Sequence, residues 1–220
     1  MTIKEAMEAR HTVRRYTDRV LSRETVSRLE SRLAENNERY GLGMKLVTEN
    51  TEAFQTVIKL VLTRGVRNYI VLAGRAGEDE RLGYCGCDVM LYAQTLGLNT
   101  WWVGGTYSKK GVRKTAGLSE GQCLAGIIAV GYGTTQGVPH KSKRAEDISA
   151  YRGDAPEWFT RGVEAVLLAP TALNKQAFRI TGEGDAVNMT CDNGIFSGVD
   201  LGIGKYHFEV GAGRENFRWA

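Results

Sequence analysis

Two arginines and a threonine alternate near the amino terminus, in the segment "EARHTVRRY" (residues 8–16). Side chains two residues apart point the same way when the backbone is extended, so Arg10, Thr12 and Arg14 are expected to face one side. Two guanidinium groups and a hydroxyl could hold a phosphate or the polar edge of a planar ring. The alternative is a solvated basic helix end, which the helix dipole favours.

A second polar group lies in "APTALNKQAFRI" (169–180), after an apolar helix expected around residues 159–167. Pro170 ends that helix, and the chain then places a hydroxyl and two amides on a stiffened backbone, from Thr171, Asn174 and Gln176. Glycine and aspartate would be enough for an ordinary turn. Either the turn itself or a ligand could need these polar groups.

The basic residues form two clusters. A net charge of +4 is too small to indicate a nucleic-acid-binding protein. Arginines crowd the first twenty residues, and "PHKSKR" (139–144) forms a second basic cluster. Two such clusters could meet around one anion. The alternative, a nucleic-acid binder with two basic arms, would be excluded if no salt-dependent shift occurred on DNA.

Other motifs that carry chemistry are incomplete. The third glycine of "GYGTTQG" (131–137) comes one residue late for a dinucleotide fingerprint, and Tyr206 stands where a phosphate loop needs Ser or Thr. Cys85-Gly-Cys87 could bind a metal, but no second cluster supports it. The histidines have no partner at ligand spacing, and no nucleophile elbow is present. We expect no metal and no catalytic side chain.

Length and composition are those of a globular protein of one large domain or two merged halves. The chain has 220 residues, of which 42% are hydrophobic and 25% charged. No apolar run approaches the ~20 residues of a membrane span, and the first residues lack the apolar core of a signal peptide. The four cysteines show no disulfide framework. These features predict reduced thiols and a cytoplasmic protein, with no membrane partner.

Helices and strands alternate along the chain, which predicts an α+β fold with helices on a mixed sheet. Helices are expected from Thr2, after Ser22, around residues 54–62, over 84–97, over 108–116, from Asp154 as a cap, and over about 194–211. Strands are expected at 43–48, 68–73, 100–105, 125–133, 177–181 and 186–191.

The two halves of the chain share a pattern. Residues 22–49 and 156–183 each run helix, polar linker, strand, and each half later has a glycine-bearing apolar helix. Few residues are identical, so the similarity is one of pattern. If a duplication occurred, only the second copy kept the Pro-Thr-x-x-Asn group.

Several of these segments resemble the FMN-dependent nitroreductase family. "ARHTVRRYTDR" is similar to the R-x-S-x-R-x-F segment that opens that family, and "APTALNKQAFRI" is similar to its A-P-S-x-x-N-x-Q-P-W-x-F signature. The likeness continues through "LGLNTWWVGG" and "PHKSKR". One departure is that the second motif, which normally follows the first closely, comes about 160 residues later. Gln176-Ala177-Phe178 also departs from the usual Q-P-W.

Because family sites combine residues of two subunits, the chain resembles a divergent single-chain branch, a pseudo-dimer. The resemblance implies a nitroreductase-like mixed sheet flanked by helices, built as two swapped half-repeats. The amino-terminal half (1–153) would carry the arginines and the basic loop, and the second half (154–220) the "APTALN" motif. One FMN site per chain follows, with a monomer expected and a homodimer left open.

The resemblance also implies roles at an FMN site. Arg10, Thr12 and the basic loop would neutralise the phosphate, and Arg14 would donate to the N1/O2 edge of the flavin. Gly104 and Gly105 would let the backbone approach N5. Pro170, Thr171 and Asn174 would cover the ring, so the polar groups of this segment would serve the flavin and not the fold. The full set of cofactor-binding candidates is Arg10, His11, Thr12, Arg14, Val103, Gly104, Gly105, Lys141, Lys143, Arg144, Pro170, Thr171, Ala172, Leu173 and Asn174.

The implied function is an FMN-dependent oxidoreductase that takes electrons from NAD(P)H and passes them to a nitroaromatic, a quinone or a similar small acceptor. Two alternatives remain open: a flavin-binding redox or storage protein with little turnover, and a flavin enzyme of different chemistry on the same scaffold. Turnover of NAD(P)H with menadione would separate the first alternative from the enzyme.

Overall fold

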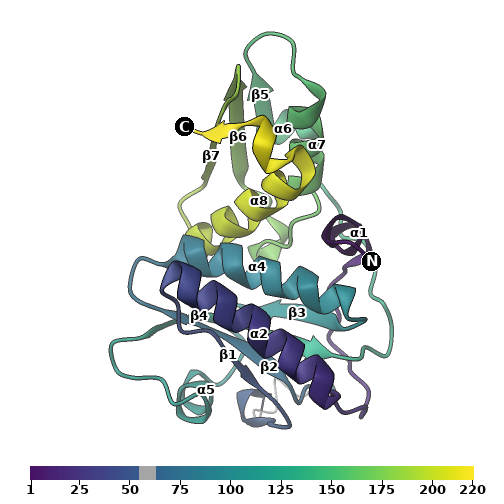
Figure 1. The fold of residues 1–220 in the computed structure, drawn as a ribbon, viewed down its shortest axis with the longest axis vertical. Helices are drawn as coiled ribbons and strands as arrows, with labels where there is room; N and C mark the ends of the chain where they lie inside the picture. The colour runs from purple at the N-terminus through teal and green to yellow at the C-terminus, as the bar shows by residue number, and fades with distance from the viewer. Residues whose placement is uncertain (55–62) are drawn as a thin grey trace.

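A computed structural model describes residues 1–54 and 63–220 of the chain. Two four-stranded sheets lie at opposite ends of the molecule, with helices between them (Figure 1). The helices are α1 (Ile3–Ala9), α2 (Arg23–Tyr40), α4 (Asp79–Thr95), α5 (Lys109–Thr115), α6 (Ala145–Ile148), α7 (Glu157–Val166) and α8 (Ser197–Ala212). The strands are β1 (Lys45–Val47), β2 (Tyr69–Gly74), β3 (Asn99–Val103), β4 (Cys123–Gly131), β5 (Ser149–Tyr151), β6 (Phe178–Glu183), β7 (Ala186–Cys191) and β8 (Arg218–Trp219). None of the helices so described is long and apolar enough to cross a bilayer.

The first sheet is antiparallel, with strand order β1-β2-β4-β3. Every residue of β2 is buried because both faces of the sheet are covered. Ile70 and Leu72 belong to the apolar cluster shared with α4, whereas Tyr69 and Val71 belong to a second cluster that includes Val112 of α5. This explains why β2 is a continuous apolar run and does not alternate.

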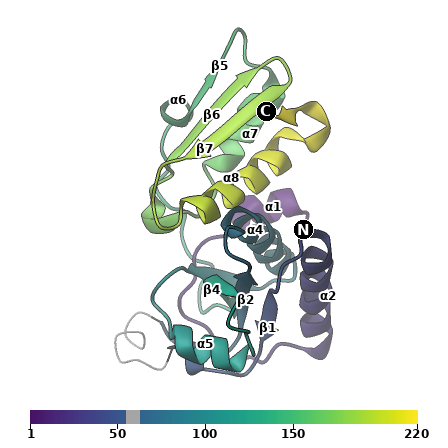
Figure 2. The same ribbon diagram turned by 90° about the vertical axis from the view of Figure 1, so that its left-hand side faces the viewer.

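The second sheet is mixed, with strand order β5-β6-β7-β8. The β5–β6 and β7–β8 pairs are parallel, and the β6–β7 pair is antiparallel. Burial alternates residue by residue along β6, as expected of a sheet with one face in the core. Helices α7 and α8 cover that inner face (Figure 2).

Helices α4 and α8 meet at the centre of the molecule through glycines. A Cβ on Gly83 would collide with the backbone of Val199, and a Cβ on Gly202 would collide with the backbone of Glu80 and Tyr84. The two helix backbones therefore touch with no side chain between them. We call this contact the glycine seam.

A buried carboxylate ties α8 and α2 to α4. Asp88 of α4 accepts two hydrogen bonds from Arg32, at 2.7 and 2.6 Å, and one each from Asn36 and the hydroxyl of Tyr206, both at 2.7 Å. Asp88 is 3% exposed, and a buried charge needs such partners to be tolerated. The network thus joins helices from both halves of the chain.

The α+β class, with sheets flanked by helices, is confirmed, as are most of the expected elements. Two boundaries were wrong. Helix α4 begins at Asp79, five residues before the expected start, because acidic residues are favourable in a first helical turn. Helix α7 begins at Glu157, and its cap is Pro156 with extended backbone, so Asp154 does not cap it. Most of the helix expected around 54–62 lies outside the described residues.

The half-repeat arrangement stays a prediction. Both halves run helix, strand, strand, helix, as α2-β1-β2-α4 and as α7-β6-β7-α8. Strand β5 precedes residue 154 but pairs with β6 of the second sheet. The division at residues 153 and 154 also stays a prediction.

Candidate functional site

The arginine segment runs along the edge of the first sheet. Thr12 pairs with Thr100 of β3, and the amide of Val13 donates to the carbonyl of Thr100 at 3.1 Å. Arg10 follows the end of α1 and is 3% exposed, Thr12 is half-buried, and Arg14 is exposed. The Arg14 guanidinium lies 5.3 Å from the centre of the Trp101 ring. Extended pairing with β3 therefore positions the segment, and Arg10 points into the protein.

Arg10 carries a buried charge without a carboxylate partner among residues 1–54 and 63–220. Its Nε is buried and has no hydrogen-bond acceptor. Burial lowers the pKa of Arg10, and the nearby Cys87 opposes that shift. Because an isolated buried cation is strongly unfavourable, this group fits an anionic ligand such as a phosphate. A buried guanidinium whose Nε–H lacks an acceptor within the described residues is compatible with a phosphorylated cofactor.

The basic loop lies beside the arginine segment. A Cβ on Gly137 would lie 2.8 Å from Cβ of His11 and 3.0 Å from the carbonyl of Thr12. Burial lowers the pKa of His11, and the charges of Arg10 and His140 lower it further. The chain that leads into the basic loop therefore lies against the arginine segment, and His140 of the loop is near enough to His11 for their charges to interact.

The three cations of the loop have different partners. Lys143 Nζ donates to the carbonyl of Gln176 at 3.0 Å, and Arg144 pairs with Asp147 at 2.9 Å and with Glu146 at 3.3 Å. Lys141 is exposed, and within residues 1–54 and 63–220 its ammonium has no ion-pair partner. Lys141 is therefore the loop cation that is free to meet an anion.

The segment 169–176 is held by its own polar side chains. Thr171 Oγ1 accepts from the amide of Gln176 at 3.0 Å, and Asn174 Nδ2 donates to the carbonyl of Lys141 at 2.7 Å. The Gln176 side chain donates to the carbonyl of Leu167 at 2.8 Å and accepts from the amide of Lys143 at 2.7 Å. These groups therefore do serve the fold, and the part of the expectation that denied this was wrong; their contact with a ligand stays a prediction.

The physical reason is the backbone of this segment. Leu173, Asn174 and Gln176 have φ values of 54°, 55° and 44°, in the left-handed region that side chains disfavour. The backbone of this segment makes one short turn, in which the amides of Asn174 and Lys175 donate to the carbonyls of Thr171 and Ala172. The amides of Ala172 and Gln176 have side-chain acceptors instead, because a buried backbone N–H needs a partner. Strained backbone of this kind is concentrated at functional sites.

A carboxylate that the sequence analysis missed also holds this segment. Asp200, in the first turn of α8, accepts the Ala172 amide with its two oxygens at 3.1 and 3.2 Å. The available signal was a lone acid within the otherwise apolar and glycine-rich "GVDLGIG".

The end of β3 completes the arrangement. A Cβ on Gly104 would lie 2.8 Å from the ring of Phe196, the residue before α8, whereas Gly105 faces open space and Val103 is buried. These contacts link the segments in a closed circuit, which we call the ring of contacts. The arginine segment adjoins the basic loop, the loop contacts the 169–176 segment, and that segment contacts the start of α8. The start of α8 lies against Gly104 at the end of β3, and β3 pairs with the arginine segment. The structure therefore gathers all the segments that carry the fifteen candidates.

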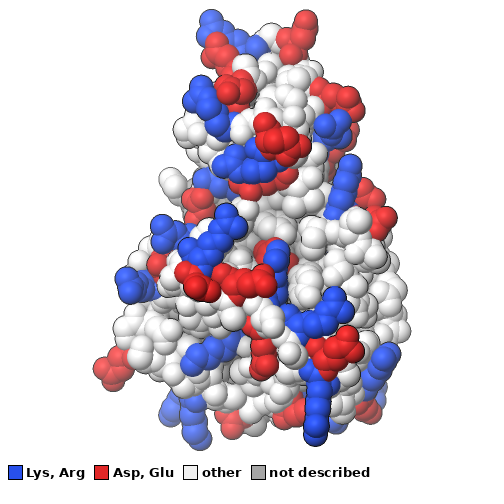
Figure 3. Space-filling model, in the orientation of Figure 1, with Lys and Arg blue, Asp and Glu red and all other residues white. Residues whose placement is uncertain are grey.

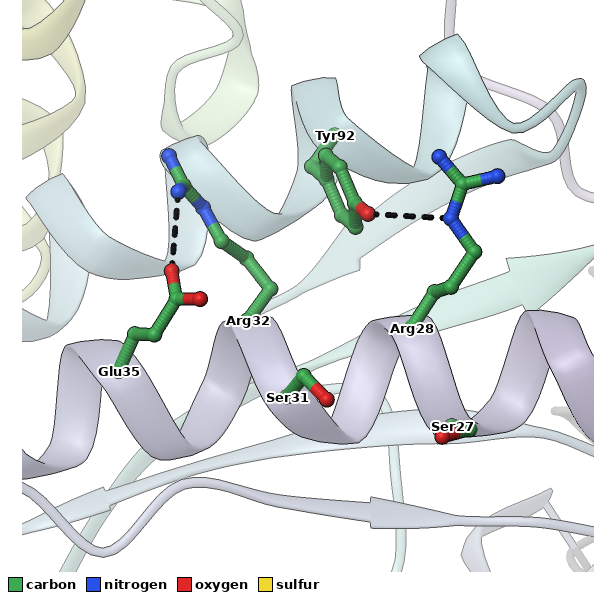
Figure 4. A pocket seen from close by; sticks show the side chains of 6 residues that line it. All are labelled: Ser27, Arg28, Ser31, Arg32, Glu35 and Tyr92. Carbon is green, nitrogen blue, oxygen red and sulfur yellow. Dashed lines mark hydrogen bonds and ion pairs between the residues drawn. The ribbon is translucent and has the colours of Figure 1, made fainter.

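Two cavities lie away from this ring. One, of about 180 Å³, lies between α2 and α4 (Figure 4) and is lined by Ser27, Arg28, Ser31, Arg32, Glu35 and Tyr92. The other, of about 440 Å³, lies on the outer face of the second sheet, near Thr181 and Asn188. Neither is lined by a candidate residue. On the face shown in Figure 3, positive and negative side chains are interspersed.

Cys85 and Cys87 lie in the core, and the described residues contain no group of three potential ligands that could hold a metal. Cys87 Sγ lies 3.4 Å from Nδ1 of His207, and that nitrogen also lies 2.9 Å from the carbonyl of Ile203. Burial lowers the pKa of His207 to about 3, so the imidazole is neutral.

Comparison with known proteins places these features in a family. A family model described as "Putative TM nitroreductase" matches residues 2–212. A solved structure of a putative nitroreductase from Thermotoga maritima is similar at 23% identity with a TM-score of 0.66, covering 98% of this chain and 85% of that one.

Two other solved structures resemble a part of the chain. A putative NADH dehydrogenase/NAD(P)H nitroreductase from Parabacteroides distasonis has 21% identity and a TM-score of 0.52, covering 66% of this chain and 95% of that one. A putative nitroreductase from Desulfovibrio desulfuricans, solved with FMN, has 18% identity and a TM-score of 0.51, covering 67% and 95%. No curated protein sequence matches significantly. Since the family model spans nearly all of the sequence, the chain belongs to the nitroreductase family.

Proposed function

We propose that the protein is an FMN-dependent oxidoreductase that moves electrons from NAD(P)H to a small acceptor such as a nitroaromatic or a quinone. The observation that carries the proposal is the buried Arg10 near the basic loop, whose Nε has no acceptor among the described residues. Family membership and the FMN in the Desulfovibrio structure support it. The Parabacteroides protein, named for NADH dehydrogenase and NAD(P)H nitroreductase activity, supports the nicotinamide donor.

Arg10 and Lys141 would hold the FMN phosphate between them. Arg10 offers a desolvated guanidinium without a carboxylate partner in the described chain, and Lys141 offers a free ammonium. Lys143 and Arg144 already have protein partners, so we assign them to shaping the loop. Charge-assisted contacts of this kind are the strong ones in phosphate binding.

FMN, when bound, would supply the redox chemistry. Arg14 is exposed and has no ion pair in the described residues, so it can donate to the flavin edge where negative charge collects. Pro170, Thr171 and Asn174 would cover the ring on a backbone fixed by their hydrogen bonds. Gly105, which faces open space, would let the first sheet approach the flavin ring, whereas the missing side chain of Gly104 makes room for Phe196.

We also propose that one chain completes one site, as a pseudo-dimer with residues 1–153 and 154–220 as its halves. The ring of contacts uses the arginine segment of the first half and the 169–176 segment of the second. The four free thiols, of which Cys123 is exposed, suit a reducing compartment, and we place the protein in the cytoplasm.

The test is the cofactor content of the purified protein and its turnover. The visible absorption bands of a flavin should be present, and the cofactor released by heat should run with FMN on chromatography. NAD(P)H should be oxidised steadily when menadione is supplied. FAD as the main species would overturn the cofactor assignment, and bound FMN without turnover would favour a storage or sensing protein.

A further inference from the structure

Asp200 is a buried carboxylate with an unusual partner. It lies in the first turn of α8 and is 7% exposed. Both of its oxygens accept the same backbone N–H, that of Ala172, at 3.1 and 3.2 Å. The contact joins α8 to the 169–176 segment across 28 residues of sequence.

The segment it holds does not keep its shape through regular structure. Leu173 and Asn174, which follow Ala172 directly, have positive φ, and such conformations persist only where surrounding contacts enforce them. Thr171 and Asn174 tie the segment to itself and to the basic loop. The hydrogen bond between Asp200 and Ala172 connects the segment to α8, and through α8 to the core of the second half.

The charge of Asp200 is poised to change near neutral pH. Burial raises the pKa of Asp200 to about 6, and the neighbouring Asp192 raises it too, whereas the Ala172 N–H and Lys175 oppose the shift. The nearby Cys191 thiol has a raised pKa, to about 11, and stays neutral. On the α4 side, Asp79 and Glu80 lie against Gly198 and Gly202.

We propose that ionised Asp200 is the positioning residue for the flavin-covering segment, so that FMN affinity falls when Asp200 takes up a proton. The proposal rests on the proposed function, because it assumes that the segment covers FMN. The family signature that the 169–180 segment resembles does not include this residue.

The sign follows from the hydrogen bond. An ionised carboxylate binds an N–H about twice as strongly as a neutral group does. Above a pH of about 6, Asp200 is ionised and holds Ala172 in place; below it, the protonated acid holds the amide weakly. Tight FMN binding is therefore present above that pH and is lost as pH falls through it. By linkage, FMN binding releases a proton from Asp200.

The experiment measures the dissociation constant of FMN from pH 5 to pH 8 for the wild type and for Asp200→Asn. The FMN phosphate titrates in the same range, but it does so for both proteins, so the ratio of the two constants removes its effect. At pH 7.5 the wild type should bind about 10-fold more tightly, the size of one charge-assisted hydrogen bond. At pH 5 the ratio should approach one.

A matched control is Asp192→Asn. Asp192 is an exposed neighbour whose charge raises the pKa of Asp200. This variant should keep the pH transition but shift it to lower pH. Hydrogen exchange of the peptide that contains Ala172 gives a second readout without flavin, since protection should fall at low pH in the wild type and stay constant in Asp200→Asn.

The outcomes separate the two proposals. A wild type that binds no FMN would overturn the proposed function. Binding with a ratio that does not change with pH, or an Asp200→Asn protein with normal affinity at pH 7.5, would overturn the role of Asp200 alone. Equal exchange at Ala172 in the two proteins at every pH would do the same.

Discussion

Replacement of Arg10 by methionine should make the apoprotein more stable and its FMN binding weaker. Arg10 is 3% exposed, and its Nε has no acceptor in the part of the chain that the structure describes. A buried charge left without a partner costs about 3–5 kcal/mol. Methionine is similar in length and flexible, so the repacking cost should stay below about 1.5 kcal/mol. The apoprotein should therefore gain about 2–4 kcal/mol of unfolding free energy.

The loss of FMN binding free energy in Arg10→Met should be similar in size to the gain in stability. A hydrogen bond to a charged group contributes about 1.5–3 kcal/mol, which corresponds to a rise in the FMN dissociation constant of about 10- to 150-fold. The midpoint of thermal unfolding of the apoprotein should rise by about 5–15 °C, at 2–4 °C per kcal/mol for a domain of this size. Thermal scans of apoprotein and quenching of FMN fluorescence measure the two effects.

Stability and FMN affinity are expected to change in opposite directions, which a merely disrupted fold would not produce. Arg15 lies on the same segment but is exposed, so Arg15→Met should change stability by no more than about 0.5 kcal/mol. If Arg10→Met destabilised the apoprotein, the arginine would have a protein partner and the unpaired-charge argument would be wrong. If FMN affinity were unchanged, Arg10 would not belong to the phosphate site.

Three further results are expected. Arg14→Ala should weaken FMN binding and slow NAD(P)H oxidation by about 2–4 kcal/mol in the transition state; normal flavin content and rate would make Arg14 an ordinary surface residue of the extended segment. Tyr206→Phe should lower the unfolding free energy in urea by about 1.5–3 kcal/mol, because it removes the 2.7 Å hydrogen bond to Asp88, and a change below about 0.5 kcal/mol would count against the network. Light scattering with flavin quantitation should give one FMN per monomer, and an obligate dimer with sites completed in trans would refute the single-chain site.

Local signals in the sequence predicted the elements well. Helix α1 begins after Thr2 as expected, with a capping box between Thr2 and Glu5. Helix α2 begins directly after Ser22, also as expected. The strand expected at 125–133 is β4, which lies two residues earlier, at Cys123–Gly131. These features depend on residues a few positions apart, so the sequence contains them directly.

The site could be predicted only in part, because its decisive features depend on distant residues. The motifs identified the right segments, but that Arg10 is buried depends on packing at the end of α1. Asp200 meets Ala172 across 28 residues, and no spacing rule reveals that pair. Gln176 was noted as a polar residue, yet its part in holding Leu167 and Lys143 together appears only in three dimensions.

At the glycine seam the backbones of α4 and α8 are in direct contact, so a displacement of one helix is transmitted to the other. Side chains at an ordinary helix interface can change rotamer and absorb a small displacement, but backbone atoms cannot. A displacement of α4 at Glu80 would therefore displace Gly202, and with it the rest of α8. Phe196 and Asp200 lie about 9 and 3 Å along that helix axis, at 1.5 Å per residue, and both border the proposed flavin site. Replacing Gly202 by alanine would therefore push α8 away from α4 and displace Phe196 and Asp200, although residue 202 does not itself border the proposed flavin site.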